Sequence, residues 1–154
     1  MKPLNPDWIS AIRESVNTCP YFQLQSMKIR DLDWGISRIE IDLAQKHLQP
    51  FGIVHGGVFA SILDAAGWWA SYTQINDNLG MTTVECKINY LAPMQSGKLI
   101  GLGQSIKQGA TIQLAEARLE NEVGKLVAHG TVTSMTLPDL KLNNQSNLPP
   151  KFLN

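Results

Sequence analysis

The 154-residue chain has only two cysteines, three histidines and no excess charge of either sign. Cys19 and Cys86 lack the spacing of metal ligands, and two cysteines would make a sparse disulfide framework. Thirteen basic residues balance thirteen acidic ones, so no overall field would attract the chain to nucleic acid or to an anionic membrane. We therefore expect no metal site and no nucleic-acid partner.

Long apolar runs are also missing. No stretch approaches the roughly 18 residues that a membrane-spanning helix needs. Asp7, Arg13 and Glu14 interrupt any signal-peptide core near the N-terminus. What remains is 44% apolar and 17% charged, which is typical of a globular protein of one domain. The sequence predicts a soluble, cytoplasmic protein without a membrane partner.

Composition and apolar spacing divide the chain into three parts. Residues 1–19 predict a helical segment, because the capping residue Asn5 and the proline Pro6 precede an apolar stripe at helical spacing. We expect residues 20–137 to form the main domain. Residues 138–154 are rich in Asn, Gln, Pro and Leu and predict a loose extension outside the core.

Within the main domain, strand patterns flank one long helical run. Residues 22–31 predict a weakly patterned strand, and residues 36–43 a sharply alternating one. Residues 55–75 predict a mostly buried helix that begins near Gly57, because the run lacks proline and has few charges. Four more strands, joined by short turns that favour an antiparallel meander, are predicted at 81–91, 98–107, 111–121 and 125–136. The order predicts an α+β fold, an antiparallel sheet wrapped around one long central helix, with apolar surface left for a partner subunit.

Asp64 is unusual because nearly every neighbour in the predicted helix is apolar or small. A buried carboxylate is costly, so it must be hydrogen-bonded, protonated or functional. A structural Asp64, satisfied by Ser61 or by a partner chain, is the alternative. Helical spacing places on or near its face Gly57, Ala60, Ser61, Gly67, Trp68 and Ser71. Towards the opposite side it places Val58, Ile62, Ala65 and Trp69. Trp68, one turn beyond the acid, would either form a pocket wall or pack against the sheet.

Two consecutive glycines, Gly56 and Gly57, stand at the helix start. The first turn of a helix leaves backbone N–H groups without partners and carries partial positive charge. Glycine lets a substrate oxygen approach these groups, which suits the developing oxyanion of acyl transfer. A simple tight turn is the alternative. His55 would be a cap, a core residue or a proton carrier.

The run QPFGIVHGGVFASILDAAG resembles the signature of hotdog-fold acyl-CoA thioesterases, the PaaI-like and 4-hydroxybenzoyl-CoA thioesterase group. The later run TTVECKINYLAP resembles the strand that follows the helix in these enzymes, and the likeness covers roughly residues 20–136. The resemblance implies a hotdog fold and hydrolysis of an acyl-CoA to a free acid and CoA, with no cofactor. It also implies a homodimer with shared active sites, whose dimers often pair again into a homotetramer.

The resemblance further implies roles for single residues. Asp64 matches the acid that acts as general base or nucleophile, and Gly56 matches the glycine whose N–H polarises the thioester carbonyl. Gln49 would position the thioester or water. Thr83 matches a Ser/Thr that assists in some members, although alternation puts it on the polar face of its strand. The remaining expected substrate contacts are His55, Gly57 and Trp68.

Two other functions stay open at this stage. A non-catalytic acyl-CoA-binding hotdog protein would share the fold, but Asp64 together with the paired glycines favours an enzyme. A hotdog dehydratase needs a histidine and a carboxylate placed to exchange protons, and the chain offers only His47, His55 and His129. Family members with glutamine at the Gln49 position often carry Glu in place of Asp64, so the pairing leaves the acyl group open.

Overall fold

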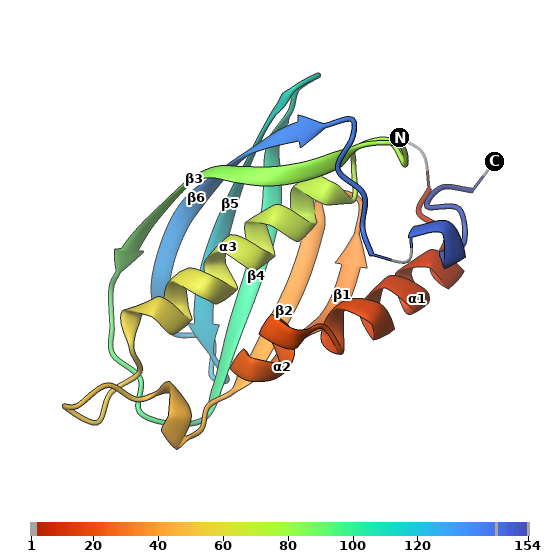
Figure 1. Ribbon diagram of the computed structural model, residues 1–154. Coiled ribbons are helices and arrows are strands. Elements are labelled where there is room, and N and C mark those ends of the chain that lie inside the picture. The colour runs from red at the N-terminus through yellow and green to blue at the C-terminus, as the bar shows by residue number, and fades with distance from the viewer. Residues whose placement is uncertain (1–2, 144, 154) are drawn as a thin grey trace.

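The computed structural model describes residues 3–143 and 145–153, and within them a six-stranded antiparallel sheet curves around one long helix (Figure 1). The helices are α1 (Pro6–Asn17), α2 (Pro20–Gln25) and α3 (Gly56–Tyr72), with short 3-10 turns η1 (Gln45–His47) and η2 (Gln145–Asn147). The strands are β1 (Met27–Asp33), β2 (Ile36–Asp42), β3 (Gly80–Tyr90), β4 (Lys98–Gln108), β5 (Ile112–Asn121) and β6 (Leu126–Leu137). The predicted α+β architecture is confirmed.

The strand order is β1-β2-β4-β5-β6-β3. The strands β4, β5 and β6 form the expected meander, but β3 does not neighbour β4. It pairs instead with β6, from Gly80 opposite Leu137 to Tyr90 opposite Ala128. The prediction of a four-strand meander is therefore wrong for β3. The place beside β4 that it assigned to β3 is occupied by β2. As a result, β3 forms one edge of the sheet and flanks α3 (Figure 1).

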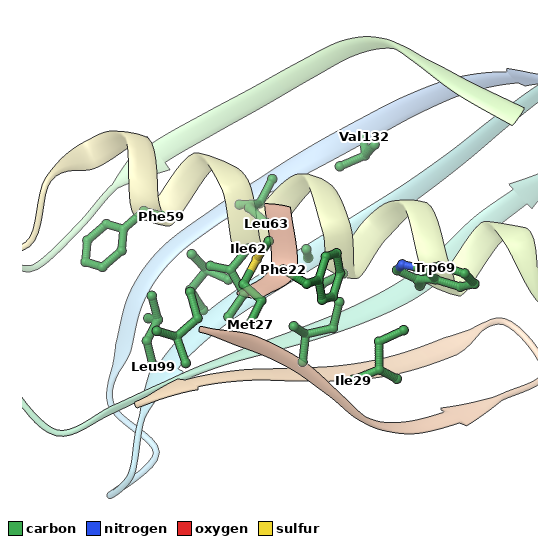
Figure 2. Packing of buried hydrophobic residues seen from close by; sticks show 14 of the residues in the cluster. Phe22, Met27, Ile29, Phe59, Ile62, Leu63, Trp69, Leu99 and Val132 are labelled. Carbon is green, nitrogen blue, oxygen red and sulfur yellow. The ribbon is translucent and has the colours of Figure 1, made fainter. Parts of the chain in front are cut away.

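The long helix lies against the concave face of the sheet. Its residues Ile62, Leu63 and Ala66 are fully buried. Figure 2 labels Ile62 and Leu63 together with other residues of the same core cluster, among them Phe22, Met27, Ile29, Leu99 and Trp69. A Cβ atom at Gly67 would lie 2.6 Å from Val132 Cγ2, so a glycine is needed for this close approach.

The face prediction for α3 needs correction at four positions. Gly67 and Ser71 are buried, although helical spacing placed them near the Asp64 face. Ala65 and Trp69, predicted on the opposite side, line the cavity that contains Asp64. The difference arises because the curved sheet covers more of the helix than one flat layer would, so only a narrow strip stays open.

The N-terminal segment contains two helices. The helix α1 begins as predicted, with Asn5 accepting a hydrogen bond from the Asp7 N–H at 3.0 Å. The strand predicted over 22–31 is wrong in its first half, since Pro20 starts the short helix α2 and Ser26, at φ 55°, ends it. In the described part of the chain, no helix is long and apolar enough to cross a membrane.

The C-terminal segment is not loose, contrary to the expectation from its composition. Leu142, Leu148 and Phe152 pack against the core, and Phe152 forms a β-bridge with Leu4. The side chain of Lys151 is buried at 1% exposure. A few apolar anchors therefore hold a segment whose average composition is polar.

Candidate active site

Asp64 lies midway along α3, on the strip of the helix that the sheet leaves open. A cavity of about 710 Å³ runs beside it, between α2, α3 and the first half of β3. The wall of this cavity is largely aromatic and aliphatic, with contributions from Phe22, Met27, Trp68, Trp69 and Met81. The carboxylate therefore meets an apolar space large enough for an acyl group.

Thr83 is the hydrogen-bond partner of Asp64. Its hydroxyl donates to Asp64 Oδ1 at 2.8 Å. Burial raises the pKa of Asp64, and the bond from Thr83 opposes this shift by favouring the ionised form. Within the residues that the structure describes, Asp64 Oδ2 accepts no hydrogen bond, so it is free to act on water or on a substrate.

Ser61 does not satisfy Asp64, so that structural alternative is wrong within this subunit. The Ser61 hydroxyl donates instead to the Gly57 carbonyl at 2.8 Å. The hydroxyl oxygen of Tyr21 lies 2.7 Å from Ser61 Oγ. Because Ser61 has already given its only proton to Gly57, Tyr21 must be the donor in this second bond.

The start of α3 shows what each of the paired glycines does. His55 caps the helix, since its Nδ1 accepts from the Gly57 N–H at 2.8 Å. A Cβ at Gly57 would lie 2.9 Å from the same Nδ1, so glycine makes room for the cap. Among residues 3–143 and 145–153 the Gly56 N–H has no acceptor. It is therefore the free donor at this helix end.

Gln49 and Gly56 line a second cavity, of about 390 Å³, together with Tyr90. The Tyr90 hydroxyl donates to the Gly56 carbonyl at 3.3 Å, and a Cβ at Gly56 would lie 3.2 Å from the Tyr90 ring. Gln49 accepts from the Phe51 N–H through Oε1. Its amide N–H groups have no acceptor in the part of the chain that the structure covers.

The two groups of predicted residues lie apart within one subunit. The Asp64 cavity contains Thr83 and Trp68, and the Gly56 cavity contains Gln49; the two cavities share no lining residue. At about 1.5 Å per residue, Asp64 and Gly56 are about 12 Å apart along the helix axis. One thioester carbonyl cannot contact both groups of the same subunit.

None of the three histidines lines the Asp64 cavity. His47 is 2% exposed; its Nδ1 accepts from the Ala44 N–H, and its Nε2 lies 2.9 Å from the Gln25 carbonyl. His129 pairs with Glu116 at 3.2 Å. His55 is a helix cap. The histidine–carboxylate pair that a dehydratase needs is therefore not present beside Asp64.

Three aromatic residues at the site escaped the sequence analysis. Tyr21 and Phe22 line the Asp64 cavity from α2, a helix that overlaps the start of the strand predicted at 22–31. Tyr90 lines the Gly56 cavity at the end of β3. The Cys19-Pro20 step was the available signal for α2, because proline is favoured at a helix start.

Comparison with known proteins agrees with this fold and identifies the family. A family model described as Thioesterase superfamily matches residues 51–128. A Saccharolobus solfataricus protein, named as a presumed esterase, is 32% identical over 123 residues, 79% of this chain and 87% of the relative. The chain therefore belongs to the thioesterase superfamily, and it is a thioester hydrolase of that family.

The chain is also similar to a solved structure and to a second relative in sequence. The crystal structure of a thioesterase from Haemophilus influenzae superimposes with a TM-score of 0.82 at 19% identity, covering 94% of this chain and all of that one. This likeness shows the hotdog fold. The mouse protein named acyl-coenzyme A thioesterase 13 is 31% identical over 96 residues, 61% of this chain and 68% of the relative.

Proposed function

We propose that this protein hydrolyses acyl-CoA thioesters to a free acid and CoA, with Asp64 as the catalytic acid residue and the Gly56 N–H as the donor to the thioester carbonyl. The observation that carries the proposal is a half-buried carboxylate with one free oxygen in the wall of a large apolar cavity. The likeness to the mouse acyl-coenzyme A thioesterase supports CoA as the thiol part of the substrate.

Partial burial suits Asp64 to either of two roles. As a general base, its carboxylate takes a proton from water while the water oxygen attacks the thioester carbon. The tetrahedral intermediate then collapses, the C–S bond breaks, and the CoA thiolate leaves and takes up a proton. As a nucleophile, the carboxylate attacks the same carbon and expels the thiolate, and water then hydrolyses the mixed anhydride. Both routes end in acid and CoA.

A second subunit is needed to complete such a site, because Asp64 and Gly56 of one chain are too far apart. The edge strand β3 is the surface we assign to it. In the described chain its outer edge pairs with no other strand, and its residues Val84 and Tyr90 are 53% and 55% exposed. Unpaired backbone with exposed apolar side chains favours pairing with another strand.

Antiparallel pairing of two β3 strands supports a shared site. Thr83, in the first half of β3, contacts Asp64, whereas Tyr90, at its end, contacts Gly56. A twofold axis near the middle of the strand places the first half of one copy beside the last half of the other. Asp64 of one subunit would then approach Gly56 and Gln49 of its partner, in a homodimer with two composite sites.

Hydrolysis of an acyl-CoA panel by wild-type protein and by Asp64→Asn tests the proposal. The substitution is nearly isosteric, so folding should survive while kcat falls roughly 10²-fold or more. Asp33→Asn, at the exposed end of β1, is the matched control and should keep full activity. Binding of acyl-CoA without hydrolysis by the wild type would instead support the non-catalytic alternative.

A further inference from the structure

A third cavity, smaller than the Asp64 and Gly56 cavities, adjoins the Asp64 cavity. It has a volume of about 280 Å³ and lies between the end of α3, the start of β3 and residues 140–143. It shares two lining residues, Trp68 and Met81, with the Asp64 cavity. These two side chains are therefore the partition between the two spaces.

The outer wall of this distal cavity belongs to the C-terminal strap, by which we mean the described residues among 138–153. The strap lies directly on the start of β3, where a Cβ at Gly80 would clash with the Leu140 carbonyl oxygen. Lys141 Nζ donates to the Asn78 carbonyl at 3.1 Å, and the Lys151 N–H donates to Asp77 Oδ2 at 3.2 Å. The strap is thus fixed to the turn that follows α3.

A stack of aromatic rings holds the partition in place. The indole of Trp68 stacks on Tyr72, with ring centroids 4.7 Å apart and planes 12° from parallel. It also meets Trp69 edge-on, with centroids 4.9 Å apart. Between these two neighbours the indole has little freedom to turn.

Lys151 connects the strap to this stack. Its ammonium lies 4.1 Å from the centroid of the Tyr72 ring, within the range of a cation–π contact. It donates to the Ile75 carbonyl at 2.8 Å and also to the Tyr72 carbonyl, at the end of α3 where carbonyls lack helical partners. One buried side chain therefore holds the backbone and the ring of Tyr72 together.

We propose that the strap determines acyl-chain length: Lys151 and Tyr72 hold the Trp68 indole as the end wall of the acyl cavity, and the distal cavity behind it receives the end of longer aliphatic chains when that wall is removed. This inference rests on the proposed function. Trp68 is a specificity-determining residue here, and Lys151 and Tyr72 are positioning residues that act through it. The wild-type protein should prefer acyl groups that end at the indole.

The test compares kcat/KM for straight-chain acyl-CoAs from two to sixteen carbons. The ratio of long-chain to short-chain kcat/KM should rise about tenfold or more in Trp68→Ala, because a few extra buried methylenes are enough for such a change. Trp68→Phe should give an intermediate ratio. Adding Leu142→Phe to Trp68→Ala refills the distal cavity and should return the ratio towards that of the wild type.

Lys151→Met tests the strap itself, with Lys125→Met in the exposed β5–β6 turn as the matched control. A folded Lys151→Met protein should show a raised long-to-short ratio, a change that a purely structural lysine would not produce. An unchanged ratio in it would overturn the role of the strap. If that variant does not fold, the Trp68 and Leu142 variants decide the distal cavity, and an unchanged ratio in both overturns the inference.

The outcomes separate this inference from the proposed function. A wild-type protein that hydrolyses no acyl-CoA contradicts the proposed function. Asp64-dependent hydrolysis with one chain-length profile across all variants contradicts only the inference about the strap.

Discussion

Thr83 gives Asp64 a hydrogen bond that works against the effect of burial on its pKa. Thr83→Val removes the donor and keeps the shape, so the pKa of Asp64 should rise further. A general base or nucleophile must be ionised, and activity is lost as pH falls through its pKa. The acid limb of the kcat/KM profile should therefore move to higher pH.

Thr82 provides the control for this measurement. Its side chain lines the same cavity, but within the described residues it makes no hydrogen bond to Asp64. Thr82→Val should leave the acid limb in place. Equal profiles for the wild type and Thr83→Val would mean that the contact does not tune the carboxylate.

Gly56 can be tested only by adding a side chain, because its proposed donor is backbone. Gly56→Val should crowd the thioester carbonyl and remove one oxyanion contact, which typically costs about 3 kcal/mol of transition-state stabilisation. That loss corresponds to about a hundredfold fall in kcat. Gln49→Ala should be milder, because positioning a substrate or water is a supporting role.

The Tyr90 ring complicates this test, since a new Cβ at Gly56 would also lie 3.2 Å from it. Combining Gly56→Val with Tyr90→Ala relieves that contact. Activity that stays low in the double variant assigns the effect to the carbonyl. Recovery in the double variant would show that displacement of the ring was responsible.

The edge strand β3 carries the proposed dimer contact, and a charge on it should separate the subunits. Val84→Lys puts like charges near a twofold axis and in an apolar contact, both of which are unfavourable. We expect the dimer fraction and the hydrolysis rate to fall together when sedimentation and activity are measured on the same samples. Val123→Lys, in the exposed β5–β6 turn, is the control; a monomeric Val84→Lys with full activity would contradict the shared site.

Mixed dimers test the composite site directly. A subunit with Asp64→Asn paired with one carrying Gly56→Val leaves one site in which both groups are intact, because each site takes its acid and its glycine from different chains. Co-purified heterodimers should regain activity that neither homodimer has. Heterodimers that form and remain inactive would contradict the composite site.

The long helix and the late strands were predictable because each is long enough to show its own period. The strand that pairs with β3 was not predictable. Alternation shows which side chains of a strand share a face, but it does not show which other strand lies beside that strand. The helix α2 was missed because six residues hold less than two helical turns of pattern. This miss removed Tyr21 and Phe22 from the predicted site.

Asp64, Thr83 and Trp68 line one cavity, so the structure brings these three predicted residues together. The separation of this cavity from Gln49 and Gly56 within one subunit agrees with the shared active sites that the family resemblance implies, and it follows from the helical rise between Gly56 and Asp64.

Across the whole molecule, the C-terminal strap joins the two ends of the chain to the end of α3. Leu4 pairs with Phe152, and Lys151 lies between Trp8 of α1 and Tyr72 of α3. The sequence predicted a loose extension because the average composition of the segment is polar. A buried lysine is rare, and no local pattern announces one. The anchor became visible only when helices far apart in the sequence were brought together.

Lys151 should also make the stability of the whole protein depend on pH. Burial lowers its pKa from 10.5 to about 7, and the charge of Asp77 only partly opposes the shift. At a pH between the folded and unfolded pKa values of Lys151, the unfolded chain binds more protons than the folded one. The free energy of unfolding therefore rises with pH in this range.

The effect is best observed between pH 7 and pH 9. Two other groups with shifted pKa values, the Cys86 thiol and the Tyr72 hydroxyl, have ordinary pKa values of 9.0 and 10.0. In the unfolded chain they therefore lose their protons only near pH 9 and above. Both of those pKa values are raised by burial, so their effect on stability has the opposite sign. Within the window the contribution of Lys151 approaches at most about 1.4 kcal/mol per pH unit. Lys151→Met should lose that slope in urea unfolding at pH 7, 8 and 9, whereas Lys125→Met should keep it. Equal slopes in the wild type and Lys151→Met would show that the ammonium of Lys151 is not destabilised by its burial.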